Sequence, residues 1–249
     1  MQIVAIIPAR YESSRFPGKP LAEIEGKSMI QRVYEQVSQL RTLTEVVVAT
    51  DDERIRDHVV QAGGKALMTS SAHRSGTERC AEAVEKLGFY PDIVVNVQGD
   101  EPFIEPVHLE QVISCFDIPD TQIATLVKKI DTAETLHNPN IPKVVFDQQY
   151  RARYFSRSII PYLRDVHQGY WLQHHTFYKH IGIYAYRTQV LLQIVQLPAG
   201  QLETAEKLEQ LRWLEHGYGI QLAVTEHENM AVDTPEDLEA LLLQIRKRS

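Results

Sequence analysis

The chain has 249 residues, of which 43% are hydrophobic and 24% charged, and its formal net charge is −7. These fractions are typical of globular domains and exclude disordered and fibrous classes. Because nucleic-acid phosphates attract basic surfaces, an acidic chain is not expected to bind nucleic acid. Any anionic ligand must therefore be met by a local cluster of cations.

The two cysteines, Cys80 and Cys115, lie too far apart for a redox or zinc motif and are too few for a disulfide scaffold. We expect two reduced, mostly buried thiols and a cytoplasmic location. Gln2 to Ile7 reads as an apolar strand with no basic stretch or cleavage site, so no signal peptide is expected. No apolar run approaches the length of a membrane span, and no membrane insertion is expected.

The first half of the chain alternates between two patterns. Short apolar runs predict buried strands over Ile3 to Ile7, Val46 to Ala49 and Ile93 to Val97. Apolar residues at helical spacing predict helices over Met29 to Leu40, Glu53 to Ala62 and Thr77 to Leu87. This alternation predicts an α/β fold of Rossmann-like type, with a mostly parallel central sheet covered by helices. Each predicted strand ends in polar residues, and ligands bind beyond the carboxyl ends of such strands.

The second half is less regular. Strands are predicted over Lys143 to Phe146, Arg153 to Phe155, His180 to Tyr186 and Gln221 to Val224. Helices are predicted over Thr188 to Gln196 and Glu203 to His216, while Asp165 to Tyr178 is read as a loop. A last helix begins after Thr234, with Pro235 at its first position and Asp237 placed for a capping box. We expect a single domain over residues 1–249, with a smaller lobe at about 130–215.

A cationic loop follows the first predicted strand. Arg10, Arg15 and Lys19 face only one acid, Glu12, within residues 8–20. Forked and point-like cations combined with flexible backbone suit a triphosphate. The loop is not a Walker P-loop, because Pro20 stands where Ser or Thr would hold the metal. The alternative is a solvated loop whose cations pair with acids elsewhere.

Blocks of sequence along the chain resemble those of the 3-deoxy-manno-octulosonate (KDO) cytidylyltransferases. They are Ile6-Ile7-Pro8-Ala9-Arg10, Ser14-Arg15, Pro17-Gly18-Lys19-Pro20-Leu21, Ser75-Gly76-Thr77-Glu78-Arg79, residues 95–102 (VNVQGDEP), Tyr154-Phe155-Ser156-Arg157, residues 180–184 (HIGIY), residues 208–212 (LEQLR) and residues 232–238 (VDTPEDL). The resemblance implies a nucleotidyltransferase fold whose smaller lobe binds the sugar and forms a homodimer. It implies magnesium-dependent transfer of CMP from CTP to the anomeric hydroxyl of KDO, an acidic eight-carbon sugar, for lipopolysaccharide biosynthesis.

The same resemblance implies roles for individual residues. Lys19, Arg10 and Asp100 are the catalytic candidates. Nucleotide contacts are implied for Pro8, Ala9, Arg10, Arg15, Lys19, Ser75, Gly76, Thr77 and Arg79. Sugar contacts are implied for Gln98, Arg157, His180, Tyr184, Glu209 and Gln210. Of the sugar residues, Arg157 has the forked guanidinium that suits a carboxylate.

Asp100 and Asp233 are the candidate ligands of Mg²⁺. Each falls at the end of a predicted element, and magnesium takes one or two carboxylates together with phosphate oxygens and water. From the residues alone, Asp100 could instead be a turn residue, and Asp233 could be an acid favoured at a helix start. The resemblance favours metal binding at both positions.

Other readings remain open. A CMP-sialate synthetase-like enzyme or one using UTP is the nearest alternative, although the sialate family usually has asparagine where Pro20 stands. A glycosyltransferase of similar build would carry a D-x-D metal motif, and Asp100-Glu101-Pro102 lacks the second aspartate. A non-catalytic nucleotide-binding regulator is the third alternative.

Overall fold

The computed structural model describes residues 1–12, 15–228, 232 and 234–248, and within these ranges the chain forms two compact units. The first unit comprises residues 1–109 and 229–249, and the second comprises residues 110–228. The second unit therefore extends beyond the expected lobe of about 130–215 at both ends. Its predicted part in sugar binding and dimer formation stays a prediction.

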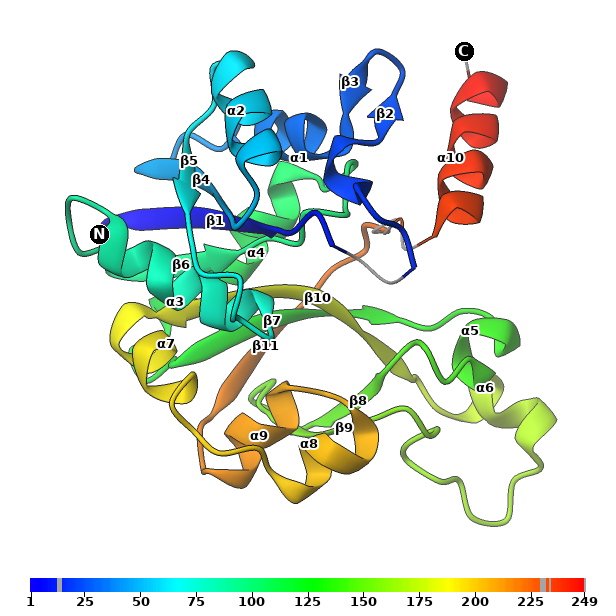
Figure 1. Cartoon of the computed structure of the whole chain (residues 1–249). Helices are drawn as coiled ribbons and strands as arrows, with labels where there is room; N and C mark the ends of the chain where they lie inside the picture. The colour runs from blue at the N-terminus through cyan, green and yellow to red at the C-terminus, as the bar shows by residue number, and fades with distance from the viewer. Residues whose placement is uncertain (13–14, 229–231, 233, 249) are drawn as a thin grey trace. The chain divides into compact units, whose positions relative to one another are not determined.

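Both units combine strands and helices (Figure 1). The first contains β1 (Ile3–Ala9), η1 (Lys19–Leu21), β2 (Glu23–Ile24), β3 (Lys27–Ser28), α1 (Met29–Val37), β4 (Glu45–Thr50), α2 (Glu53–Gln61), β5 (Ala66–Met68), α3 (Gly76–Lys86), β6 (Ile93–Asn96) and α10 (Pro235–Arg248). α4 (Pro106–Ser114) leads into the second unit. That unit contains η2 (Cys115–Asp117), β7 (Ile123–Lys129), α5 (Ala133–His137), β8 (Lys143–Phe146), β9 (Ala152–Ser156), η3 (Gln168–Tyr170), α6 (Trp171–His174), β10 (Tyr178–Arg187), α7 (Thr188–Ile194), α8 (Gln201–Glu206), α9 (Gln210–Glu215) and β11 (Ile220–Val224).

The sheet of the first unit is parallel, in the order β6-β1-β4-β5. Nearly every residue of β1, β4 and β6 is buried, as expected for strands with helices on both faces. The chain runs outward from β1 to β4 and β5, then returns through α3 to β6 on the other side of β1. Right-handed crossovers then place α1 and α2 on one face and α3 on the other (Figure 1). The direction of winding reverses between β1 and β6, which is where such sheets bind ligands.

The C-terminal helix α10 completes the core of the first unit. Val232 and Leu241 pack with Ile24 and Met29 in one buried cluster. The capping box predicted at its start is confirmed, because the Thr234 hydroxyl accepts from the Asp237 amide at 3.2 Å and the Asp237 carboxylate accepts from the Thr234 amide at 2.9 Å.

The second unit is built on a mixed sheet. β7 pairs in parallel with β11 and antiparallel with β10, and β8 pairs antiparallel with β9 and β10. The register between β10 and β7 shifts between Ile181 and Tyr184. Within this irregularity the Thr125 hydroxyl donates to Ile183 O at 2.6 Å. The irregularity occurs in the stretch of β10 that carries two of the candidate sugar residues.

Two expectations for the second unit were wrong. Residues 203–216 do not form one helix, because Lys207 adopts a left-handed conformation (φ 54°) that separates α8 from α9. Residues 165–178 are not only loop, because they contain η3 and α6. Trp171 of α6 is buried with Ile130, Leu136 and Phe177, and this apolar contact orders the stretch despite its polar composition.

Cys80 and Cys115 are both buried, as expected, and burial raises the pKa of the Cys115 thiol to about 11. None of the helices in the described ranges has both the length and the apolar character of a membrane span.

Candidate active site

A cavity of about 230 Å³ opens in the first unit at the carboxyl ends of β1 and β6. The parallel register pairs Ile6 with Asn96, so the residues that follow each strand reach the same edge of the sheet. The cavity is lined by Pro8, Ala9, Arg10, Arg15, Lys19, Pro20, His73, Arg74, Ser75, Gly76, Arg79, Gln98, Gly99 and Asp100. It therefore brings together the cationic loop, the start of α3 and the segment after β6, as the sequence motifs predict.

Two glycines allow these segments to meet. A Cβ atom at Gly76 would lie 3.0 Å from Pro8 Cγ, and a Cβ atom at Gly99 would lie 3.0 Å from the Pro8 carbonyl oxygen. Both distances are tighter than ordinary van der Waals contact, and the second involves main chain that has little freedom to move. Glycine at these positions thus lets three backbone segments approach one another around the cavity.

The cationic loop is folded back on itself beside the cavity. The Gly18 amide donates to Tyr11 O at 2.9 Å, and Gly18 has a φ of 73°, which favours glycine. The Arg54 guanidinium lies 3.4 Å from the centre of the Tyr11 ring. Ser13 and Ser14 lie outside the described residues. Arg10, Arg15 and Lys19 all line the one cavity. Because Lys19 pairs there with Asp100, an acid elsewhere in the chain, the alternative of a loop whose cations pair with acids elsewhere stays open.

Lys19 and Asp100 meet directly inside this cavity. The Lys19 Nζ atom lies 2.6 Å from Asp100 Oδ2, and the two side chains are 14% and 26% exposed. The main chain of Asp100 also accepts a hydrogen bond from the Val232 amide at 2.9 Å. The chain thus returns to Asp100 at residue 232, while Asp233 itself lies outside the described residues and its role stays a prediction.

Arg79 lines the cavity, but its guanidinium is engaged by other side chains of the protein. Its guanidinium donates to Thr69 Oγ1 at 2.6 Å and to Asp51 Oδ2 at 3.0 Å, and the residue is 3% exposed. The polar residues that follow β4 have structural roles, because Asp51 pairs with Arg79 and Asp52 caps α2. Of the three strands whose polar carboxyl ends were predicted to face a ligand, only β1 and β6 are followed by residues that line the cavity.

The start of α3 is formed by Ser75, whose hydroxyl accepts from the Glu78 amide at 3.2 Å. Thr77 is buried at 3% exposure and is not among the residues lining the cavity, so its predicted nucleotide contact stays a prediction. His73 and Arg74 line the cavity and were not identified from the sequence. The available signal was an imidazole and a guanidinium directly before the Ser75-Gly76 helix start.

Most of the candidate sugar residues lie in the second unit, around β10 and α9. His180 and Tyr184 have ring centres 5.2 Å apart, and the Tyr184 ring packs edge-on against Trp213 at 5.1 Å. Burial lowers the pKa of His180 to about 4 and raises that of Tyr184 well above its usual value. Both side chains are therefore neutral near pH 7. His180 Nε2 lies 3.0 Å from the Thr125 hydroxyl.

Several buried polar atoms of this region have no hydrogen-bond partner in the described part of the chain. They are the Tyr184 hydroxyl, Gln210 Nε2 and Trp213 Nε1. An unmade hydrogen bond in a buried position costs about 1–3 kcal/mol, so such groups are rare without a functional reason.

The remaining sugar candidates have separate surroundings. The Arg157 guanidinium donates to three carbonyl oxygens, of Glu206 at 2.7 Å, Pro139 at 3.0 Å and Lys207 at 3.4 Å. Two of its five N–H groups make no hydrogen bond within the described residues. Gln98 lines the cavity of the first unit, and Glu209 immediately precedes α9.

Comparison with known proteins identifies the family of the chain. The family model described as "Cytidylyltransferase" matches residues 4–226. The chain belongs to the cytidylyltransferase family. It is 56% identical to the 3-deoxy-manno-octulosonate cytidylyltransferase of Parabacteroides distasonis, over 100% of both chains. It is also 48% identical to the 8-amino-3,8-dideoxy-manno-octulosonate cytidylyltransferase of Shewanella piezotolerans, over 96% of both chains.

Among solved structures, the cytidylyltransferase chain is similar to CMP:2-keto-3-deoxy-manno-octonic acid synthetase complexed with CTP. The TM-score is 0.92, with 43% identity over 100% of both chains. The predicted α/β fold with a mostly parallel central sheet and the resemblance to the KDO cytidylyltransferases are both confirmed.

Proposed function

We propose that this chain transfers CMP from CTP to the anomeric hydroxyl of KDO and releases pyrophosphate, for lipopolysaccharide biosynthesis. The observation that carries the proposal is the cavity in which Lys19 and Asp100 meet beside Arg10 and Arg15. The names of the relatives support the two substrates.

The reaction is an in-line displacement. The hydroxyl oxygen of the sugar forms a bond to the α-phosphorus, the bond from that phosphorus to the pyrophosphate oxygen breaks, and the hydroxyl proton is released. Arg10, Arg15 and Lys19 offset the charge that builds up on the phosphate oxygens. Positioning and electrostatics of this kind account for most of the catalysis in phosphoryl chemistry.

We further propose Mg²⁺ as the cofactor. Within the described residues, no three His, Cys, Asp or Glu side chains gather into a metal site. Magnesium does not need such a cage, because it binds one or two carboxylates together with phosphate oxygens and water. Asp100 fits this role, since its carboxylate lines the cavity beside the phosphate-binding cations, and Asp233 is the proposed second ligand. The ion would lower the pKa of the attacking hydroxyl and offset charge at phosphorus.

The sugar is proposed to bind through neutral groups and one guanidinium. Tyr184 and Gln210 offer unsatisfied polar atoms to sugar hydroxyls, and His180 offers a neutral ring. Arg157 offers its remaining N–H groups to the sugar carboxylate. We also propose, from the resemblance alone, that the enzyme is a cytoplasmic homodimer.

The test is pyrophosphate release by the purified chain, with each of the four nucleoside triphosphates and with KDO, 8-amino-KDO and sialic acid as acceptors. We expect release with CTP and KDO, its loss on chelation, and its recovery with Mg²⁺. Faster pyrophosphate release with sialic acid than with KDO, or with UTP than with CTP, would contradict the proposal. The 8-amino sugar is the strongest competing acceptor, because two relatives that are 48% identical carry that name. Light scattering of the same sample tests the dimer.

A further inference from the structure

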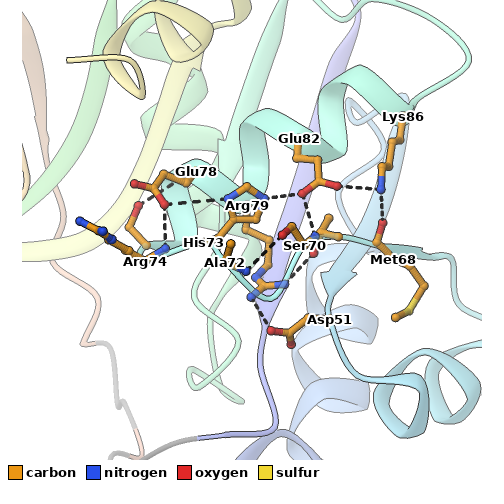
Figure 2. A network of polar contacts seen from close by, with 12 residues as sticks. Asp51, Met68, Ser70, Ala72, His73, Arg74, Glu78, Arg79, Glu82 and Lys86 are labelled. Atoms are coloured by element: carbon orange, nitrogen blue, oxygen red, sulfur yellow. Dashed lines mark hydrogen bonds and ion pairs between the residues drawn. The ribbon is translucent and has the colours of Figure 1, made fainter. Parts of the chain in front are cut away.

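A short segment, residues 69–74, connects β5 to α3, and its last two residues form part of the cavity wall. His73 and Arg74 of this segment line the cavity. The segment has no regular secondary structure, so its shape must come from other contacts. Figure 2 shows that these contacts come from the side chains of α3, which runs alongside it.

Three α3 side chains, four residues apart in sequence, bind the main chain of this segment and of Met68, which directly precedes it. Glu78 Oε2 accepts from the Arg74 amide at 2.7 Å. Glu82 Oε2 accepts from the Ser70 amide at 2.8 Å, and Lys86 donates to Met68 O at 2.7 Å. Residues four apart share one face of a helix, so α3 offers a row of polar groups that matches the backbone of the segment.

The His73 imidazole is held between two of these acids. Its Nε2 atom is hydrogen-bonded to Glu82 Oε2, and its Nδ1 atom lies 3.9 Å from Glu78 Oε2. The other oxygen of Glu82 pairs with Lys86 at 2.7 Å. Although partial burial raises the pKa of Glu82, Lys86, the Ser70 amide and His73 together lower it to about 2, so Glu82 is ionised at neutral pH.

Glu82 does not itself line the cavity. Its carboxylate is hydrogen-bonded both to the Ser70 amide and to the His73 ring, so one side chain holds two points of the segment (Figure 2). We propose that Glu82 is a positioning residue for nucleotide binding, which fixes the His73 ring and residues 70–74 in the shape that receives CTP. The inference rests on the proposed function, because it takes CTP as the ligand of this cavity.

The experiment compares Glu82→Gln with Glu85→Gln. Glu85 is exposed on the same helix, so its substitution removes one charge without touching the wall. We expect Glu82→Gln to raise the CTP dissociation constant and KM by about 10-fold, the scale for losing a charged hydrogen-bond partner, with kcat within about twofold of the parent. Glu85→Gln should leave both within about twofold. The dissociation constant is measured by calorimetry without sugar.

A double-mutant cycle with His73→Ala separates positioning from general stability. If Glu82 acts through His73, the double variant should bind CTP about as weakly as either single variant. Additive losses, or a Glu82→Gln protein that is less stable yet binds CTP like the parent, would overturn the inference. If Glu82→Gln does not fold, Glu82→Asp takes its place, since it keeps the charge and withdraws it from the His73 ring.

The two proposals fail differently. A parent protein that binds CTP but releases no pyrophosphate with KDO would defeat the proposed function, and the cycle on CTP binding would still decide the role of Glu82. Normal pyrophosphate release together with unchanged CTP affinity in Glu82→Gln would defeat the role of Glu82 alone. A parent that binds no CTP defeats both.

Discussion

The two units treat their polar groups differently. In the first unit several charged side chains at the cavity are paired, as Lys19 is with Asp100 and Arg79 is with Asp51. In the second unit several of the candidate sugar residues are neutral and buried, and the Tyr184 hydroxyl and Gln210 Nε2 have no hydrogen-bond partner in the described residues. The first arrangement suits a ligand with several negative charges, and the second suits a ligand with many hydroxyl groups.

This difference has an energetic consequence. Paired charges near a surface contribute little to stability and cost little, so a charged site can be kept ready for its ligand. A buried polar atom with no partner lowers the stability of the fold until a ligand arrives. We therefore expect substitutions in the first unit to act mainly on catalysis and nucleotide binding. Some substitutions in the second unit should trade sugar binding against stability.

The largest effect is expected for Asp100→Asn. Losing one preorganised electrostatic group should lower turnover by about 10²–10³-fold, with little change in the free energy of unfolding. Lys19→Ala should act on the same scale. Steady-state pyrophosphate release by folded protein checks both, and an Asp100→Asn enzyme with normal turnover would rule out the metal assignment.

The next largest effect is expected where backbone segments of the first unit approach one another closely, at Gly99. Gly99→Ala places a methyl group 3.0 Å from Pro8 O, and the resulting overpacking should cost about 1–3 kcal/mol and weaken CTP binding. Gly88→Ala is the matched control, since a Cβ atom there meets nothing within 4 Å. Urea unfolding and CTP titration of both variants measure the effect. Equal behaviour of the two would show that the crowding at Gly99 is relieved without cost.

The pH dependence of stability distinguishes the units more directly. His180 has a folded pKa of about 4, below the ordinary unfolded value of about 6.5, so the unfolded chain takes up its proton first as the pH falls. The stability that depends on neutral His180 is complete above about pH 6.5 and declines toward pH 4, by about 2 kcal/mol at pH 5. For Glu82 the folded pKa is about 2 against 4.5, so its contribution is lost only below about pH 4.5.

Mild acid should therefore weaken the second unit first. Urea unfolding of the parent and of His180→Gln at pH 7.5 and pH 5 tests this expectation. The variant should lose about 2 kcal/mol less than the parent on acidification. Equal losses would mean that the His180 ring accepts a proton in the folded protein without difficulty.

The smallest effect is expected for Tyr184→Phe. It removes a buried hydroxyl that has no partner in the described structure, so the free energy of unfolding should stay the same or rise by up to about 1 kcal/mol. The KM for KDO should rise about 10-fold, while the KM for CTP should not change. Tyr218→Phe is the control, since its hydroxyl already donates to Gln193 Oε1 at 3.3 Å. A Tyr184→Phe enzyme with an unchanged KM for KDO would place the hydroxyl outside the sugar site.

The same contrast explains what could be predicted from the sequence. The cationic loop and the capping box at Thr234 are local patterns, and each was found because its chemistry lies within a few consecutive residues. His73 and Arg74 were missed because their place in the cavity depends on Glu78 and Glu82, which only the helical turn of α3 brings alongside them.

In the second unit the missing information is mostly tertiary. The left-handed Lys207 that ends α8 is not a glycine, so no local signal marks the break. β7 was not identified, because a short apolar run cannot be told from a buried helical segment by periodicity alone. That the Tyr184 hydroxyl lacks a partner depends on the whole surroundings of the side chain, which no sequence pattern records.

The hydrogen bond from the Val232 amide to Asp100, and the packing of Val232 and Leu241 against Ile24 and Met29, bear on how the protein is made. A nascent chain on the ribosome carries all of the cationic loop and α3 long before residue 232 has been added. The first unit can close its core and support Asp100 only after the entire second unit has been translated.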